Sequence, residues 1–224
     1  MHRNRAWTWK GWRKIEEKIV KFKAIKENTS AKIIEKKSKF IANVFYVESI
    51  EEAEQYIKDI KKEYHDAKHN CFAYAIETPE GGIAVKYNDD GEPQGTAGAP
   101  ILKLILEKGL SNILVIVTRY FGGILLGTGG LVRAYSGVVE EALRKAQIIE
   151  KARGYEVKIQ VNYDNLENLR YHLEKMNIKI LKVEYSEKIE ITIDILKNNL
   201  EEITKNNKLK IEKQNILKEK FVEI

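Results

Sequence analysis

Two glycine-rich segments constrain the fold of this chain more than any other feature. They are NDDGEPQGTAGAP at residues 88–100 and TRYFGGILLGTGGLVRAY at residues 118–135, and together they hold more than half of the chain's 14 glycines. Glycine loses more conformational freedom on folding than any other residue, so this density indicates a backbone that turns through positive φ or packs very closely. Apolar residues at three- and four-residue spacing follow each segment, which predicts that each one opens a helix.

The start of a helix is a candidate anion site, because its first N–H groups are free and the helix dipole is positive there. We expect residues 95–98 and 127–130 to line one cleft, with Arg119 between them. The alternative is that the glycines serve only tight turns and close helix packing. The candidate ligand-binding residues lie in the two segments and just upstream of them: His69, Asn70, Asp89, Asp90, Glu92, Gly95, Thr96, Gly98, Arg119, Tyr120, Gly122, Gly123, Gly127, Gly129, Gly130 and Arg133.

The charged residues of these segments have two possible roles. Arg119 and Arg133 are candidate ligands for a phosphate or for a carboxylate of a partner. Alternatively, they pair with Asp89, Asp90 or Glu92. Those three carboxylates are candidate Mg²⁺ ligands, but DDGEP is also favourable turn chemistry and no phosphate-loop lysine follows it. We favour the turn, and we predict neither a metal site nor a cofactor.

A cysteine and a histidine lie two residues apart where the chain enters the predicted strand 71–77. Cys71 and His69 would share one face of that strand, but no third group is evident that would orient a thiol nucleophile. We therefore name no catalytic residue, and we expect a binding protein rather than an enzyme.

Three ungapped strings carry a resemblance to a known family. His69-Asn70-Cys71, DDGEPxGTAGxP and TRYFGGxxLGTGGLVRAY occur here in the order typical of the IMPACT family, in its bacterial YigZ-type form. The chain resembles that family strongly over about residues 30–150. The resemblance implies an α+β fold with two domains. The first is similar to the second domain of ribosomal protein S-five and to domain IV of elongation factor G, and the second is ferredoxin-like. Eukaryotic relatives with an extra N-terminal domain act in translational control, and no established catalytic activity comes with the family.

The chain is expected to divide into three parts. Residues 1–19 form a basic leader with Trp7, Trp9 and Trp12, residues 20–150 the IMPACT-type domain, and residues 151–224 the ferredoxin-like domain. A start site assigned too far upstream is the simplest account of the leader. The alternative is an arm that stacks on bases or inserts into a membrane interface.

Local patterns predict the elements of both domains. Ser49 followed by Glu52 is a capping-box pattern that predicts a helix start. In the first domain we expect a strand pair over 31–47, a helix from residue 49, strands at 71–77, 83–87 and 112–118, and helices ending near residues 109 and 145. In the second domain we expect β-α-β-β-α-β order, with strands at 155–162, 178–186, 188–195 and after 208, and helices at 164–176 and 197–206.

The net charge of +6 is unevenly distributed. Residues 1–40 hold 13 basic and 4 acidic residues, residues 41–150 hold 11 and 16, and residues 151–224 hold 15 and 13. The domain that carries the motifs is thus acidic, which weakens a nucleic-acid interpretation of the basic pI. The single cysteine and the absence of an apolar run of ~20 residues predict a cytoplasmic protein without a membrane span.

Two classes of function remain. The first is an RNA- or ribosome-associated binding protein that influences translation. The second is an enzyme or sensor that holds a small phosphorylated ligand, such as a nucleotide, at the two helix starts. We choose the first on the family resemblance, and the sequence leaves the oligomeric state open.

Overall fold

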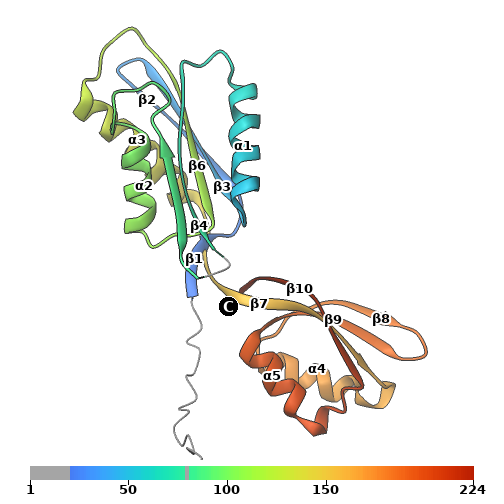
Figure 1. Ribbon diagram of the computed structural model, residues 1–224. Coiled ribbons are helices and arrows are strands. Elements are labelled where there is room, and N and C mark those ends of the chain that lie inside the picture. The colour runs from blue at the N-terminus through green and yellow to red at the C-terminus, as the bar shows by residue number, and fades with distance from the viewer. Residues whose placement is uncertain (1–20, 79–80) are drawn as a thin grey trace, which may run out of the picture.

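The apolar runs of the chain pair into two antiparallel sheets in the computed structural model, which describes residues 21–78 and 81–224 (Figure 1). Each sheet has five strands, and helices pack against both, so the expected α+β class is confirmed. The leader expected at residues 1–19 lies outside the described residues. No helix among the described residues is long and apolar enough to cross a membrane.

The first sheet carries both glycine-rich segments. Its strands lie in the order β2 (Thr29–Glu35), β3 (Ser38–Tyr46), β6 (Ile113–Tyr120), β4 (His69–Glu77) and β5 (Ile83–Asn88). Its helices are α1 (Ile50–Glu63), α2 (Gly98–Glu107) and α3 (Thr128–Lys145). These bounds agree closely with the expected elements, and the Ser49 hydroxyl accepts a hydrogen bond from the Glu52 N–H at 3.1 Å, as the capping pattern predicts.

Both faces of this sheet are buried. Along β6, Ile113, Val115 and Val117 point into the core under α2 and α3, whereas Leu114 and Ile116 point into the core under α1. This period of two explains the continuous apolar run of β6, since both sides of a central strand need apolar side chains. The result is a three-layer domain with α1 on one side and α2 and α3 on the other (Figure 1).

The second sheet follows the predicted β-α-β-β-α-β order. Its strands and helices are β7 (Ile148–Val161), α4 (Leu166–Lys175), β8 (Ile180–Tyr185), β9 (Ile189–Leu196), α5 (Lys197–Lys205) and β10 (Lys213–Glu223). β7 pairs with β9 along one edge and with β10 along the other, and β9 pairs with β8. α4 and α5 cover one face, over a core that includes Val157, Ile159 and Ile191.

β7 connects the two domains. It begins before residue 150 and continues to Val161, so the expected boundary falls within one strand. The first part of β7 pairs with β1 (Lys21–Ile25), although the sequence places residues 20–150 in the first domain. A continuous strand, rather than a flexible linker, therefore crosses from one domain to the other.

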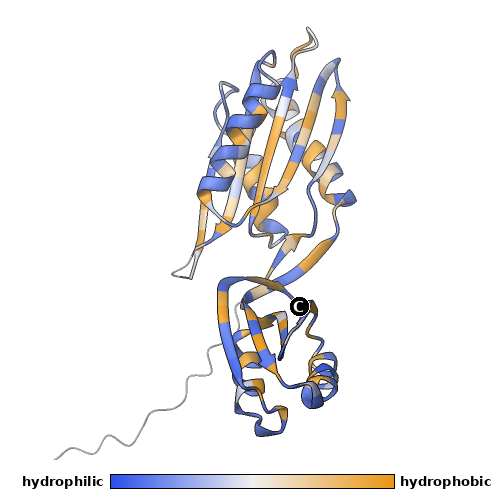
Figure 2. Ribbon diagram, turned by 90° about the vertical axis from the view of Figure 1, so that its right-hand side faces the viewer, coloured by the Kyte–Doolittle hydropathy of each residue, from blue (hydrophilic) through white to orange (hydrophobic). Residues whose placement is uncertain are grey.

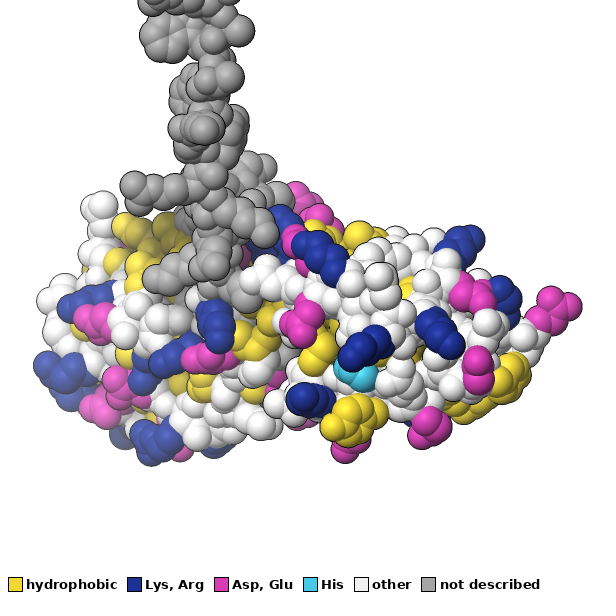
Figure 3. Space-filling model, turned by 90° about the horizontal axis from the view of Figure 1, so that it is seen from below, with side chains coloured by type: hydrophobic (Ala, Val, Ile, Leu, Met, Phe, Trp, Pro, Cys, Tyr) yellow, Lys and Arg dark blue, Asp and Glu magenta, His cyan; other side chains and the backbone are white. Residues whose placement is uncertain are grey.

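Apolar and polar residues alternate along the strands of the second sheet (Figure 2), and the apolar ones face α4 and α5, so the other face is polar, as the sequence predicts. Its charges are paired across strands: Lys158 Nζ lies 2.8 Å from Glu190 and 3.3 Å from Glu184, and Lys220 Nζ lies 2.8 Å from Asp194. Basic and acidic side chains are also interspersed on the face seen in Figure 3. This pairing leaves little net charge on the sheet with which to attract a polyanion.

Candidate functional site

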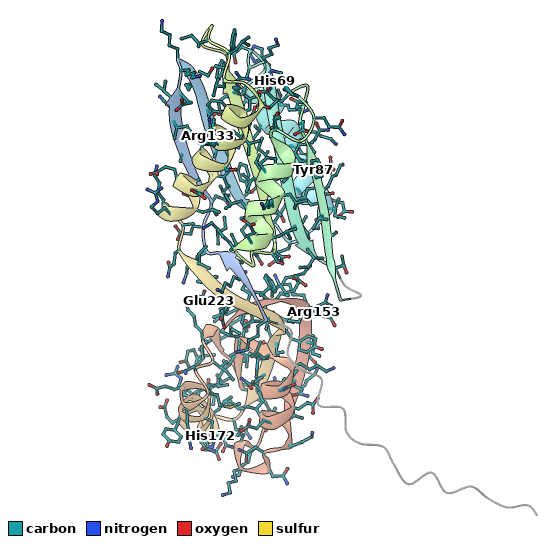
Figure 4. The ribbon with its side chains drawn as sticks, turned by 90° about the vertical axis from the view of Figure 1, so that its left-hand side faces the viewer. His69, Tyr87, Arg133, Arg153, His172 and Glu223 are labelled. Atoms are coloured by element: carbon teal, nitrogen blue, oxygen red, sulfur yellow. The ribbon has the colours of Figure 1, made fainter. Side chains whose placement is uncertain are left out.

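The two glycine-rich segments lie at the same end of the first sheet. β5 ends at Asn88, which pairs with Phe72 near the start of β4, and β6 ends at Tyr120, which pairs with Lys39 near the start of β3. His69 and Arg119 are paired at this end, and Figure 4 shows His69 there. α2 and α3 begin from these segments and pack on the same face of the sheet, so the starts of both helices lie on the same side of the sheet.

The carboxylate of Asp89 occupies the start of α2. Its Oδ2 accepts a hydrogen bond from the N–H of Gly95 at 2.8 Å, and its Oδ1 accepts from the N–H groups of Ala97 and Gly98 at 3.1 and 2.8 Å. A Cβ on Gly98 would lie 2.7 Å from the backbone oxygen of Asn88, so this close approach requires glycine. The protein's own side chain therefore fills the position where the sequence predicts a bound anion.

Asp90 ties the same turn to β4 and α1. Its Oδ2 accepts from the N–H of Asn70 at 2.7 Å, and its Oδ1 lies 2.7 Å from Lys61 Nζ. His69 Nδ1 lies 2.9 Å from the carbonyl oxygen of Asp90, and the Thr96 hydroxyl donates to the Pro93 carbonyl at 2.6 Å. Within residues 21–78 and 81–224 there is no group of three or more side chains suited to a metal ion, and these contacts favour the turn interpretation.

Glu92 forms a buried ion pair with Arg119. Arg119 Nη1 donates to Glu92 Oε1 at 2.6 Å, and both side chains are more than nine-tenths buried. The hydroxyl of Tyr135 on α3 donates to the same oxygen at 2.8 Å, while Arg119 Nε has no hydrogen-bond partner. Arg119 thus takes the ion-pairing role that the sequence leaves open. Tyr135 is a member of this cluster that the sequence analysis misses, because its position fits the apolar stripe of α3.

Cys71 is a buried thiol rather than an activated nucleophile. Its Sγ donates to the Asp89 carbonyl at 2.9 Å and lies 3.4 Å from the Tyr135 hydroxyl. Burial raises the pKa of Cys71 to about 12, and the Tyr135 hydrogen bond offsets this only in part. His69 directs Nδ1 at the Asp90 carbonyl, so it does not act as a base for the thiol in this structure.

We expect Cys71 to react slowly with iodoacetamide. At pH 8 the raised pKa lowers the thiolate fraction roughly a thousandfold relative to an unfolded thiol of pKa about 8.5, and the thiolate is the nucleophile. The rate of mass increase in native buffer, compared with the rate in urea, measures this. Similar rates in the two solutions would show that Cys71 is accessible and ionised.

The second segment packs on the turn between β2 and β3. The N–H of Gly122 donates to the Ser38 hydroxyl at 3.1 Å, and a Cβ on Gly122 would lie 2.0 Å from the carbonyl carbon of Lys37. Gly123 and Gly127 have positive φ angles of 83° and 72°. Gly127 is the N-cap of α3, and no side chain caps the first turn formed by Thr128, Gly129 and Gly130.

The start of α3 is accordingly open, unlike that of α2. A cavity of about 240 Å³ lies beside it, lined by Ile33, Glu35, Lys36, Leu126, Gly130, Arg133 and Ala134. Arg133 is exposed on α3 (Figure 4), and it forms no ion pair or hydrogen bond with any described residue. The same holds, within the described part of the chain, for the exposed Lys36 and Lys37 of the β2–β3 turn. The first glycine-rich segment does not line this cavity. The cavity is therefore not the single cleft that we expect between the two segments.

Apolar side chains of the second glycine-rich segment are also exposed. Phe121 and Leu125 are 49% and 81% exposed, and the Arg119 guanidinium carbon lies 5.6 Å from the centre of the Phe121 ring. We define the loop-end surface as Lys36, Lys37, Phe121, Leu125, residues 127–130 and Arg133. Its lysines and Phe121 are functional candidates that the sequence alone does not single out. The β2–β3 turn comes next to the second glycine-rich segment because β3 pairs with β6, so the two are neighbours in space although they are far apart in the sequence.

Two other candidates lie on the opposite face of the sheet, toward α1. The Tyr120 hydroxyl donates to Asp66 at 2.7 Å, which raises the pKa of Tyr120 to about 12, and Lys39 Nζ lies 4.4 Å from the centre of its ring. Asn70 accepts a hydrogen bond from the Thr118 hydroxyl at 2.7 Å. The sheet therefore separates Tyr120 and Asn70 from the loop-end surface.

Comparison with known proteins identifies the class of this two-domain α+β chain. Residues 36–143 match the model of the Impact N-terminal domain, and residues 159–206 match a domain of unknown function, DUF1949. The chain is 38% identical to the IMPACT family member YigZ of Escherichia coli over 150 residues, which is 67% of this chain and 74% of that protein. It is also 38% identical to the IMPACT family member YvyE of Bacillus subtilis over 166 residues, 74% of this chain and 76% of that protein.

The chain belongs to the IMPACT family, and it is similar to bacterial members of the YigZ and YvyE type. A crystal structure of a hypothetical protein, 29% identical, matches with a TM-score of 0.60 over 88% of this chain and 98% of that one. Both glycine-rich segments and the loop-end surface lie within the matched Impact N-terminal domain.

Proposed function

We propose that this protein binds RNA, free or within a ribosomal particle, through the loop-end surface, and that it influences translation in this way. The observation that carries the proposal is the group of exposed cations, Lys36, Lys37 and Arg133, beside the uncapped start of α3. Cations without carboxylate partners attract phosphates, and free N–H groups at a helix start add hydrogen-bond donors for them.

The exposed aromatic ring supports RNA over other polyanions. Phe121 is 49% exposed and precedes Gly122, which packs on Lys37 of the β2–β3 turn. Base stacking on aromatic side chains is the second element of single-stranded nucleic-acid recognition. The translation part of the proposal rests on the family, whose first domain resembles ribosomal protein S-five and elongation factor G domain IV by analogy of fold. The second sheet, with its paired charges, contributes little to this binding in our proposal. A cytoplasmic location would fit both RNA binding and an influence on translation.

The alternative is a small phosphorylated ligand bound at the start of α3. The cavity there, of about 240 Å³, is smaller than the roughly 300–1,000 Å³ of most ligand pockets. It has room for a phosphate group rather than for a whole nucleotide. Asp89 already occupies the start of α2, so the two helix starts do not form a joint nucleotide site.

We expect the triple variant Lys36→Ala/Lys37→Ala/Arg133→Ala to bind structured RNA at least tenfold more weakly than the wild type, since three phosphate contacts are lost. Fluorescence anisotropy with labelled RNA, and co-sedimentation with purified ribosomal subunits, measure this. The matched control is Lys175→Ala/Lys179→Ala/Lys210→Ala, which removes the same charge from exposed sites of the second domain. Equal weakening in both variants would indicate a general charge effect, and unchanged binding in the first would contradict the proposal.

A further inference from the structure

β5 is an outer edge of the first sheet, and Lys86 is its one charged side chain. Among the described residues it pairs with β4 alone, in regular register from Phe72 opposite Asn88 to Glu77 opposite Ile83 (Figure 1). It contains no proline and no bulge. Natural edge strands are commonly blunted by such features, because unpaired N–H and C=O groups invite another strand.

An apolar stripe runs along this edge. Ile83, Val85 and Tyr87 alternate along β5, each about half exposed, and their partners on β4 face α2. Figure 4 shows Tyr87 on this outer strand. On α2, Leu106 is 46% exposed. Lys108, just after the end of α2, lines a cavity together with residues of α3. Leu106 is two residues away, so helical spacing places it on the opposite side of α2, away from α3. We call Ile83, Val85, Tyr87 and Leu106 the β5 stripe.

We propose that β5 pairs with β5 of a second copy of this chain, antiparallel about a two-fold axis at Val85. In this register Val85 lies opposite the Val85 of the copy, and Ile83 lies opposite Tyr87. The two stripes then form one apolar surface on the α2 side, and two five-stranded sheets become continuous. Isologous contacts of this kind are the usual basis of homodimers.

The distribution of charge along β5 favours this register and a second copy of the chain as the partner. On the other face of β5, the same alignment sets Lys86 opposite Ala84, so the two copies of Lys86 do not face each other. An axis at Lys86 would oppose like charges, and an axis between Val85 and Lys86 would bring the apolar face of one strand against the polar face of the other. Lys86 is also already paired with Glu54 at 2.7 Å. The strand is thus complementary to itself in the register centred on Val85.

The test is the molar mass of the full chain in solution, measured by sedimentation velocity over a wide range of concentrations. We expect a reversible dimer. Val85→Lys should raise the dissociation constant by roughly a hundredfold or more, since two uncompensated lysines would meet at the axis. The control is Ile34→Lys, an exposed site on β2 at the opposite edge of the same sheet, which should leave the dimer unchanged. A monomeric wild type, or equal effects of the two variants, would overturn the proposal.

A cross-link provides a second measurement that does not depend on weakening the interface. Val85→Cys should give a covalent dimer with a short bis-maleimide, whereas Ile34→Cys should not, and the buried Cys71 should not react. Failure of Val85→Cys to cross-link while the chain sediments as a dimer would show that another surface forms the interface.

Discussion

Replacing Glu92 with leucine is expected to lower the free energy of unfolding by about 3–5 kcal/mol, because it leaves the Arg119 guanidinium buried without its carboxylate. The pair is 2.6 Å apart and lies beneath the turn that opens α2, so water does not substitute readily for the lost partner. The substitution also removes the acceptor of the Tyr135 hydroxyl. Few single substitutions in this chain should cost more.

Urea denaturation followed by circular dichroism measures this effect. The double variant Glu92→Leu/Arg119→Met should recover much of the lost stability, since an apolar pair of similar volume often replaces a buried ion pair without loss. Glu54→Ala provides the surface control, because the exposed Glu54–Lys86 pair should contribute no more than about 1 kcal/mol. A cost for Glu92→Leu as small as that of Glu54→Ala would mean that Arg119 remains solvated.

Gly122→Ala is expected to destabilise the protein by about 3 kcal/mol or more, because overpacking at this site involves backbone atoms. A Cβ there would lie 2.0 Å from the carbonyl carbon of Lys37, and backbone cannot move aside as a flexible side chain can. The strain would separate the second glycine segment from the β2–β3 turn, so the loop-end surface should also change.

The matched control for Gly122→Ala lies in the same region of the chain. Gly137 is within α3, and a Cβ there would meet no atom within 4 Å, so Gly137→Ala should stabilise the protein by about 0.5–1 kcal/mol. Thermal unfolding of both variants should therefore give shifts of opposite sign. Shifts of the same sign would contradict the assignment of Gly122 to close packing.

Much of the fold follows from local sequence patterns. Helix α1 is predicted correctly because Ser49, Glu52 and the apolar spacing all act within one segment. The pairing of β1 with β7 is not predictable in this way, since it joins residues more than a hundred positions apart. No spacing rule indicates that Lys21–Ile25 completes the second sheet rather than the first.

The candidate site shows the same division between local and long-range information. The sequence indicates that the carboxylates of DDGEP serve a turn, but it cannot say which one caps α2 and which one meets Arg119. Asp89 and Glu92 are distinguished only by how the turn lies over β4 and β6. Likewise, Arg119 and Arg133 look equivalent in the sequence, yet strand β6 buries the first while α3 exposes the second.

The salt dependence of RNA binding shows whether the loop-end surface binds phosphates of RNA. If the loop-end surface neutralises phosphates, log affinity should fall linearly with log salt concentration, with a slope of about −0.7 per phosphate contacted on a single strand. We predict a steep slope for the wild type and, for Lys36→Ala/Lys37→Ala/Arg133→Ala, a slope that is shallower by about 2. A shallow slope in the wild type with tight binding of inorganic phosphate, or an unchanged slope in the triple variant, would contradict the account and favour a small phosphorylated ligand.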